Sequence, residues 1–247
     1  MPSHLPRHKT VVSFVRRSSR MNDSQQRALT RLSSRYLVDL PRGEFETSIP
    51  EGTTVDFSEL FQRPVGIDAS PLVVEIGSGA GEAFIARAAA HPEASHVAFE
   101  VFQRSIALTM MRAEAAGIDN IRIIAADGVQ GLERLIPSGF ISELHILFPD
   151  PWHKKRHHKR RLINPSFASL ASDRLADGAT WYLATDWPDY AEQMRSVLDA
   201  SPDLINLYPD TWAERPERPI SHYEQRGLNQ GRHSYELRYQ RMKRTEI

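Results

Sequence analysis

One carboxylate between two prolines is the most chemically suggestive feature of this chain. Asp150 lies between Pro149 and Pro151, and this Pro-Asp-Pro segment comes directly after the apolar run 144–148. That run is short and has no helical periodicity, which is typical of a buried strand. Proline fixes its own φ and favours extended geometry in the residue before it. We therefore expect Asp150 to be held rigidly at the carboxyl end of a strand, where open α/β sheets bind their ligands.

A dense run of cations follows this acid. It contains Lys154, Lys155, Arg156, Lys159, Arg160 and Arg161, with His153, His157 and His158 among them. The formal net charge of the chain is zero, so affinity for a nucleic acid has to come from such local clustering. A solvated helix face explains a basic run by itself, and a turn explains an acid between prolines. Together, a rigid acid and adjacent cations indicate chemistry on a polyanion.

A glycine-rich turn supplies a second candidate site. Residues 75–81 read EIGSGAG and separate a predicted strand, 72–76, from a predicted helix, 82–90. Glycines let a ligand approach the backbone, and the start of a helix offers free N–H groups. The spacing G-x-G-x-G departs from the G-x-G-x-x-G of nicotinamide sites. It resembles the first motif of Rossmann-like methyltransferases that bind S-adenosylmethionine, although a tight strand–helix connection alone would also use glycines.

Other acids lie at the ends of the next predicted strands. Glu100 ends the second strand at the distance expected of a ribose-binding acid, Asp127 follows the third, and Asp186 follows the fifth. Separately, each is explained as a surface acid or a turn residue. Glu75, Glu100, Asp127 and Asp150 would thus line successive strand ends. Such an acidic pocket suits a ligand that carries a sulfonium and an ammonium group and disfavours the pyrophosphate of NAD.

The elements that must position these residues alternate along the chain. Strands are predicted over 72–76, 96–101, 121–125, 143–148 and 179–185, and helices over 82–90, 103–116, 165–176 and 188–200. Repeated βα units predict an α/β fold with a doubly wound, mostly parallel sheet. The alternating run 235–242 predicts a closing, antiparallel strand.

Two domains are predicted: a basic N-terminal arm with a helix over 1–45, and a catalytic domain over 46–247. The helix is expected to begin near Asp23 or Ser24, which can cap it, and residues 41–70 are expected to be a connection. The arm either solubilises the chain or adds phosphate contacts.

Composition restricts the function classes further. The chain is 40% hydrophobic and 25% charged and has no cysteine, which excludes disulfides, thiolate metal sites and cysteine nucleophiles. No apolar run approaches a membrane span, and the apolar stretch 11–15 is too short for a signal peptide. His153 and His157 have the spacing of a helical metal site but lack an acid in register, so we predict no metal. A cytoplasmic protein is the expectation.

The ordered motifs FPDPWHK, RHHKRR and EIGSGAG, with QQRA near the N-terminus, resemble those of the bacterial tRNA (guanine-N7-)-methyltransferase family. The resemblance runs from about Arg16 to Arg241. It implies the Rossmann-like class I methyltransferase fold, S-adenosyl-L-methionine as cofactor, and tRNA as partner, with guanosine 46 of the variable loop as the target. A monomer and a homodimer both remain open.

The resemblance also assigns roles to residues. The cofactor-binding residues that it implies are Glu75, Gly77, Gly79, Glu100, Asp127 and Asp150. The residues that it implies for substrate or RNA are Lys154, Arg156, His157, His158, Lys159, Arg160, Arg161, Asp186, Ser221 and Glu224. The family's Thr-x-Phe-Glu motif reads Ser-His-Tyr-Glu here, at residues 221–224, and Arg226 and Gly227 follow it. Serine keeps the hydroxyl and tyrosine keeps the ring.

The reaction that the resemblance implies does not need a general base to remove a proton first. Guanine N7 is already a lone-pair nucleophile, so the enzyme has to orient it and stabilise the positive charge that forms. Asp150 is the predicted catalytic residue, with Asp186 as second candidate. Trp152 and Trp187 follow these two acids and either stack on a base or pack in the core, which is the simpler interpretation.

Three alternatives remain open. A methyltransferase for an exocyclic amine has a similar Asp-Pro-Pro-aromatic motif, but the basic run after Trp152 argues against it. A non-catalytic RNA-binding protein would not need the intact glycines or Glu100. The glycine spacing argues against a nicotinamide dehydrogenase.

Overall fold

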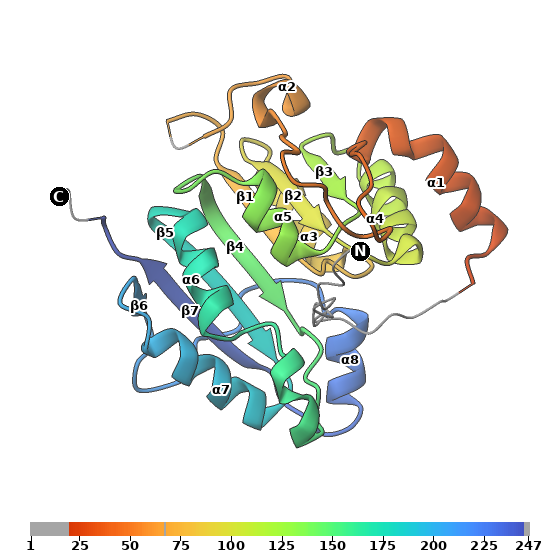
Figure 1. The fold of residues 1–247 in the computed structure, drawn as a ribbon. Coiled ribbons are helices and arrows are strands. Elements are labelled where there is room, and N and C mark those ends of the chain that lie inside the picture. Colours follow the sequence, from red (N-terminus) through yellow and green to blue (C-terminus); the bar gives the residue numbers. More distant parts are fainter. Residues whose placement is uncertain (1–19, 67, 245–247) are drawn as a thin grey trace, which may run out of the picture.

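The computed structural model describes residues 20–66 and 68–244 and has a seven-stranded sheet at its centre (Figure 1). The strand order is β3-β2-β1-β4-β5-β7-β6. The strands are β1 Leu72–Ile76, β2 Ser95–Phe99, β3 Ile121–Ile124, β4 Ile141–Leu147, β5 Leu175–Thr185, β6 Leu204–Asn206 and β7 Tyr235–Arg241. The first five pair in parallel, and β7 runs antiparallel to both β5 and β6. The predicted fold class and the antiparallel closing strand are confirmed.

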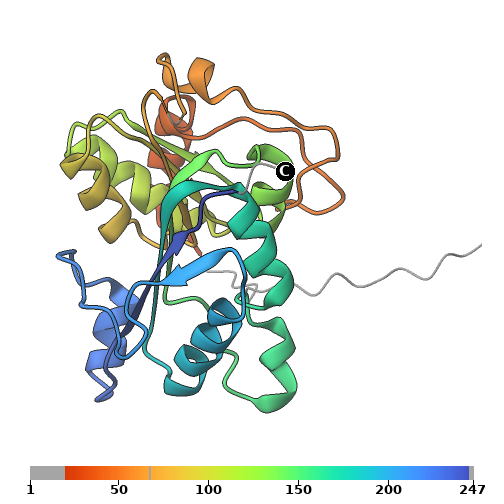
Figure 2. The same ribbon diagram turned by 90° about the vertical axis from the view of Figure 1, so that its left-hand side faces the viewer.

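Helices cover both faces of this sheet. They are α1 Asp23–Tyr36, α2 Phe57–Phe61, α3 Glu82–Ala90, α4 Gln103–Ala115, α5 Gly128–Leu135, α6 Pro165–Arg174, α7 Pro188–Asp199 and α8 His222–Leu228, with a 3-10 helix, η1, over Lys155–Arg160. The elements α1, α3 and α4 share one apolar cluster with β2 and β3, whereas α2, α5, α6 and α7 pack in the larger cluster. Figure 2 shows α8 on the same side of the sheet as α3 and α4, opposite α6 and α7.

Several elements differ from the prediction. The cap of α1 is Asn22, whose side chain accepts from Gln25 N at 2.9 Å while Gln25 accepts from Asn22 N at 3.1 Å. This reciprocal pair satisfies two free N–H groups. The helix begins at Asp23, as predicted, but its cap is Asn22 rather than Asp23 or Ser24. The region expected to be a connection contains α2. The short elements α5, β6 and α8 were not predicted, because their periodicity extends over too few residues.

The basic arm can be followed only in part. Residues 1–19 lie outside the described residues. The helix α1 packs against α4 through Leu32 and Tyr36, and Arg31 forms an ion pair with Glu114. The predicted division at residue 45 stays a prediction.

The parallel register brings the strand ends to one edge. Ile76 pairs with Phe99, Phe99 pairs with Ile124, and Leu147 pairs with Ala184. The residues that follow these strands therefore leave the sheet side by side, as the sequence predicts.

None of the helices in the described part of the chain has the length and apolarity needed to cross a membrane.

One face of the sheet buries histidines in their neutral form. His145 lies on β4 beside the pair Glu75–Arg87, bonds Glu143 at 3.0 Å and stacks on Tyr182 at a centroid distance of 4.7 Å. Burial, followed by the charge of Arg87, lowers the pKa of His145 from 6.5 to about 3. The unfolded chain binds this proton first, so stability is lost as the pH falls from 6.5 towards 3.

We predict that the variant His145→Gln loses this pH dependence. The stability advantage of wild type over the variant should shrink by about 1.4 kcal/mol per pH unit between pH 6.5 and 4. Urea unfolding at four pH values measures it, with His233→Gln as an exposed control. A difference that stays constant with pH would show that His145 does not titrate in this way.

Candidate active site

A cleft of about 680 Å³ opens at the carboxyl edge of the sheet. Its walls come from the turns after all five parallel strands, β1 to β5, and from α8. Of the residues predicted for the site, Gly77, Gly79, Glu100, Asp150, Lys154, His157 and Asp186 line it. Segments that are far apart in sequence thus contribute to one cavity.

The glycine turn forms the floor of the cleft. Gly79 has φ +57° and Gly81 has φ +83°, a backbone region that disfavours other residues. A Cβ at Gly81 would also lie 2.6 Å from Thr109 Oγ1. These two glycines are needed for the turn itself, besides giving a ligand access to the backbone.

Three backbone N–H groups hold Glu100 in the cleft. Its carboxylate accepts from Gly79 N at 2.8 Å, Val101 N at 2.7 Å and Phe102 N at 3.0 Å, and the residue is 4% exposed. Burial raises the pKa of Glu100, and the three N–H donors oppose that rise. A carboxylate has about four lone-pair positions, so acceptor capacity remains for a ligand hydroxyl.

Two other predicted cofactor acids lie outside the cleft. Glu75 pairs with Arg87 at 2.7 Å and opens to an adjoining pocket of about 400 Å³, which shares Gly77 and Gly79 with the cleft. Asp127 caps α5 and accepts from the N–H groups of residues 129 and 130, while Gly128 forms part of the cleft wall. Burial raises the pKa of Asp127. The backbone beside Asp127, rather than its side chain, lines the cleft.

The turn that carries Asp150 has an unusual backbone. Phe148 has φ +53° and Trp152 has φ +44°, so two non-glycine residues in left-handed conformation bracket the Pro-Asp-Pro segment. The extended geometry that Pro149 favours in the preceding residue was therefore a wrong expectation for Phe148, whose φ is positive. Such conformations cost about 1–3 kcal/mol each and persist where surrounding contacts determine them. Here Phe148 N donates to Ala184 O at 2.8 Å and ties the turn to β5.

The basic run folds into η1 at the rim. Lys154 lines the cleft, and Arg156, Lys159 and Arg160 are exposed, with the Arg160 guanidinium 4.9 Å from the centre of the Trp152 ring. Burial and the neighbouring cations lower the pKa of His157, so it adds little positive charge at neutral pH.

Two members of the run turn away from the rim. His158 lies 3.8 Å from Asp189. Arg161 is 2% exposed, donates to Pro151 O at 2.8 Å and pairs with Asp189 at 2.5 Å. Its predicted contact with RNA is inconsistent with this position, because the guanidinium is already bound within the protein. Arg161 instead fastens the Pro-Asp-Pro turn to α7.

Asp186 connects the cleft with α8. Its carboxylate accepts from Arg232 Nε at 2.7 Å, and a Cβ at Gly227 would lie 2.5 Å from Asp186 Oδ2. The Arg232 guanidinium also lies over the Trp187 ring, at 5.1 Å. Both Trp187 and Trp152 line the cleft, and Trp187 also packs against the core. Core packing therefore explains only part of their contacts.

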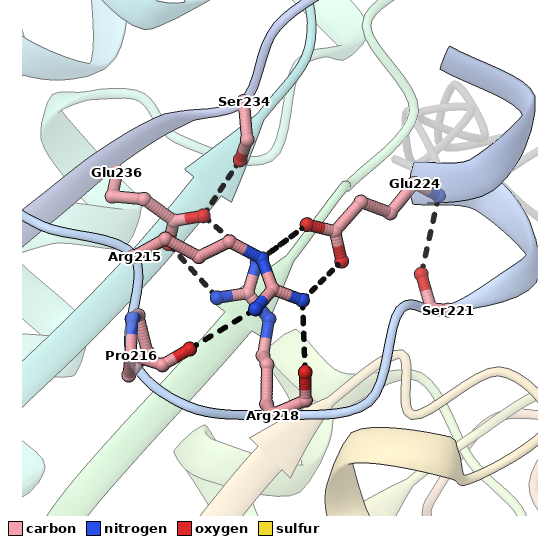
Figure 3. Close-up of polar contacts among 7 residues, drawn as sticks. All are labelled: Arg215, Pro216, Arg218, Ser221, Glu224, Ser234 and Glu236. Carbon is pink, nitrogen blue, oxygen red and sulfur yellow. Dashed lines mark hydrogen bonds and ion pairs between the residues drawn. The ribbon is translucent and has the colours of Figure 1, made fainter. Parts of the chain in front are cut away.

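The predicted substrate motif is placed differently. Ser221 caps α8 by accepting from Glu224 N at 3.2 Å, and it lines the adjoining pocket. Glu224 is 4% exposed, pairs with Arg215 at 2.6 Å (Figure 3) and lies outside the cleft lining. Tyr223 and Arg226, which belong to the motif but were not assigned to the site, line the cleft, and so do Gln230 and Arg232, which the prediction missed. For Tyr223 and Arg226 the motif itself was the available signal, whereas Gln230 and Arg232 lie beyond the end of α8, where helical spacing does not identify them.

Among curated proteins, the tRNA (guanine-N(7)-)-methyltransferase of Cutibacterium acnes is 48% identical over 235 residues, which cover 94% of this chain and 83% of that protein. The protein of the same name from Alkalilimnicola ehrlichii is 38% identical over 234 residues, which cover 94% and 93%. The chain belongs to the tRNA (guanine-N(7)-)-methyltransferase family. A family model described as "Putative methyltransferase" matches residues 69–237 of this family member.

A solved structure supports the fold. The 16S rRNA methyltransferase KamB superposes with a TM-score of 0.50 at 17% identity, over 76% of this chain and 93% of that chain. In the methyltransferase chain, no group of three or more potential metal ligands occurs within residues 20–66 and 68–244.

The placement of two adjacent arginines in this family member leads to a prediction on stability. Arg161→Met should lower the free energy of unfolding by about 2 kcal/mol, since it removes a buried cation from a half-exposed partner. Arg160→Met, the matched exposed variant, should cost less than about 1 kcal/mol. Urea denaturation measures both. Equal losses would contradict the buried anchoring role of Arg161.

Proposed function

We propose that this protein transfers a methyl group from S-adenosyl-L-methionine to N7 of a guanosine in tRNA. The observation that carries the proposal is the shared cleft: Asp150 and Glu100 line one cavity, and the exposed cations of η1 stand at its rim. We further propose guanosine 46 of the variable loop as the target, and a cytoplasmic enzyme that acts as a monomer or homodimer.

The cleft suits the proposed cofactor. Its volume lies within the roughly 300–1,000 Å³ typical of small-molecule sites. Glu100 would accept from the ribose hydroxyls, because three N–H donors leave it acceptor capacity and fix its direction. Gly77 and Gly79 would let the ligand approach the backbone, and Glu75 lines the adjoining pocket while it is paired with Arg87. When bound, S-adenosylmethionine supplies an electrophilic methyl group.

Asp150 would orient the target base and oppose the positive charge that develops on it. Its strained turn is tied to β5 through Phe148 and to α7 through Arg161, so little reorganisation is needed on binding. A preorganised carboxylate stabilises a developing cation more strongly than solvent does, because it needs no reorganisation during the reaction. Lys154 and Asp186 are the proposed substrate contacts beside it.

The exposed cations of η1 would bring the tRNA to this edge. Arg156, Lys159 and Arg160 lie on the outer surface, next to the cleft rather than inside it. That position favours contacts with phosphates, which attract the RNA without selecting a base.

The direct test is incubation of unmodified tRNA with labelled S-adenosylmethionine, followed by nucleoside analysis. N7-methylguanosine sites break on borohydride and aniline treatment, whereas methylated exocyclic amines do not. Label in an amine would favour the alternative activity. No binding of S-adenosylmethionine in isothermal titration would favour a non-catalytic RNA-binding protein.

We predict that Asp150→Asn lowers kcat by roughly 100-fold or more, because the variant keeps the size of the side chain but loses its charge. The dissociation constant of S-adenosylhomocysteine should stay within about threefold of wild type if Asp150 acts mainly on the base. Single-turnover kinetics and calorimetry measure the two quantities. Wild-type turnover would remove Asp150 from its proposed role.

A second variant tests the RNA surface. Replacing Arg156 and Arg160 together by alanine should weaken tRNA binding and reduce the slope of log K against log salt by about one to two, as fewer counterions are released. The matched control replaces Arg134 and Lys243, which are exposed cations outside both the basic run and the N-terminal arm. An unchanged slope would mean that η1 faces solvent in the complex.

A further inference from the structure

A buried ion pair lies beneath the glycine turn. Arg87 donates through Nη1 to Glu75 Oε2 at 2.7 Å, and the two side chains are 14% and 3% exposed. Glu75 belongs to β1 and Arg87 to α3, the two elements that the glycine turn joins. The pair therefore ties the strand before the turn to the helix after it.

The surroundings of the pair leave Arg87 as the cation that faces Glu75. His145 is the partner of Glu75 in the parallel register of β1 and β4, and His96 lies on β2, the other neighbour of β1. Burial, followed by the charge of Arg87, lowers the pKa of His96 from 6.5 to about 4 and the pKa of His145 to about 3. Both rings are therefore neutral at pH 7 and do not compete with Arg87 for the carboxylate.

One member of the pair reaches a ligand site and the other does not. Glu75 lines the adjoining pocket of about 400 Å³, beside Gly77 and Gly79, whereas Arg87 belongs to the lining of neither this pocket nor the cleft in the described part of the chain. The two cavities share both glycines. A ligand that extends from the cleft across the glycine turn would bring one end to Glu75.

The pairing uses only part of the acceptor capacity of Glu75. Arg87 occupies Oε2, and a carboxylate has about four lone-pair positions in all. Among residues 20–66 and 68–244, the other oxygen, Oε1, accepts no hydrogen bond. A carboxylate at this depth would be costly without a counter-charge, and Arg87 offsets that cost. Oε1 is thus an anionic acceptor with a fixed direction, which suits a cationic group of a ligand.

We propose that Arg87 is a positioning residue for the cofactor: it holds the Glu75 carboxylate in the direction that receives the ammonium group of S-adenosylmethionine. This inference rests on the proposed function. Arg87 acts through Glu75 and does not itself touch the ligand. The role concerns only the amino-acid end of the cofactor, because Glu100 and the glycine backbone would hold the adenosine end in the cleft.

Two ligands separate this role from a general loss of structure. S-adenosylhomocysteine carries the ammonium group, whereas methylthioadenosine has the same adenosine and sulfur atom without the amino-acid end. Wild type should bind S-adenosylhomocysteine more tightly by roughly 10-fold or more, because a hydrogen bond between charged groups has that effect. Isothermal titration measures both dissociation constants.

The variants are Arg87→Met, Arg87→Lys, Glu75→Gln and the combination of Arg87→Met with Glu75→Gln. The matched control is Arg174→Met, since Arg174 is also mostly buried, at 18% exposure, and pairs with Asp173. It lies at the end of α6, on the opposite face of the sheet from α3 (Figure 2).

We expect Arg87→Met to weaken binding of S-adenosylhomocysteine by roughly 10-fold or more and to leave binding of methylthioadenosine within about threefold, since only the ammonium group loses a charged partner. Glu75→Gln should show the same pattern. Arg87→Lys should recover most of the affinity, because it keeps the cation. Arg174→Met should match wild type with both ligands.

The double variant distinguishes an indirect role from a direct one. If Arg87 acts only through Glu75, adding Arg87→Met to Glu75→Gln should change the dissociation constant of S-adenosylhomocysteine by less than about threefold. A further loss of roughly 10-fold would show that Arg87 contacts the ligand itself and would overturn the positioning role.

The double variant also separates binding from folding. Removing a buried pair whole costs less stability than removing one member, so urea denaturation should show the double variant to be more stable than either single variant. Its affinity for S-adenosylhomocysteine should stay low nevertheless. Recovery of that affinity together with stability would show that the single variants lose binding through unfolding, against the inference. If Arg87→Met does not fold, Arg87→Gln replaces it and the same comparisons decide.

Other outcomes would also contradict the role of Arg87. Equal losses for the two ligands in Arg87→Met would show that the pair holds the glycine turn as a whole. Unchanged affinity for S-adenosylhomocysteine in that variant, or a wild type that binds both ligands equally well, would show that the ammonium group does not depend on the pair. A wild type that binds neither ligand would instead refute the proposed cofactor, and with it the proposed function.

Discussion

The parallel hydrogen-bonded register of β2, β1, β4 and β5 is the constraint on which the rest of the structure depends. Because these strands run in one direction and end near one another, the turns after them meet at a single edge. Gly79, Glu100 and Asp150 come from three such turns and line one cleft. A register shift of one residue would turn each of these strands over and separate the groups.

Buried charge then fixes what the sheet brings together. Glu100 is held by backbone donors, Arg161 joins the Pro-Asp-Pro turn to α7, and Arg218 joins α8 to β7. Charges of this kind are costly to leave unpaired, so each one restrains its partners to a narrow geometry. A cleft that has to align a base without removing a proton depends on such restraint more than on a strong base.

The segment from residue 213 to residue 232 shows how one helix can serve two purposes. On α8, Tyr223 and Arg226 line the cleft while Glu224 is buried beneath it. The short helix packs few apolar residues, so its place is set by ion pairs and by the contact of Gly227 with Asp186. Residues that line the cleft and a residue that is buried therefore alternate within one motif.

The sequence by itself determined the α/β class, the main strands and helices, the glycine turn and the acids at the strand ends. Periodicity, glycine spacing and proline geometry are local signals, and parallel strands carry them to one edge by topology alone. Which charges are buried was decided only by the tertiary structure. Arg160 and Arg161 are neighbours of the same type, yet one is exposed and the other is enclosed by residues 10 to 32 positions away. The same holds for Glu224, since its arginine partners and its separation from the cleft depend on how the loop before α8 packs on β7, and no local pattern records that packing.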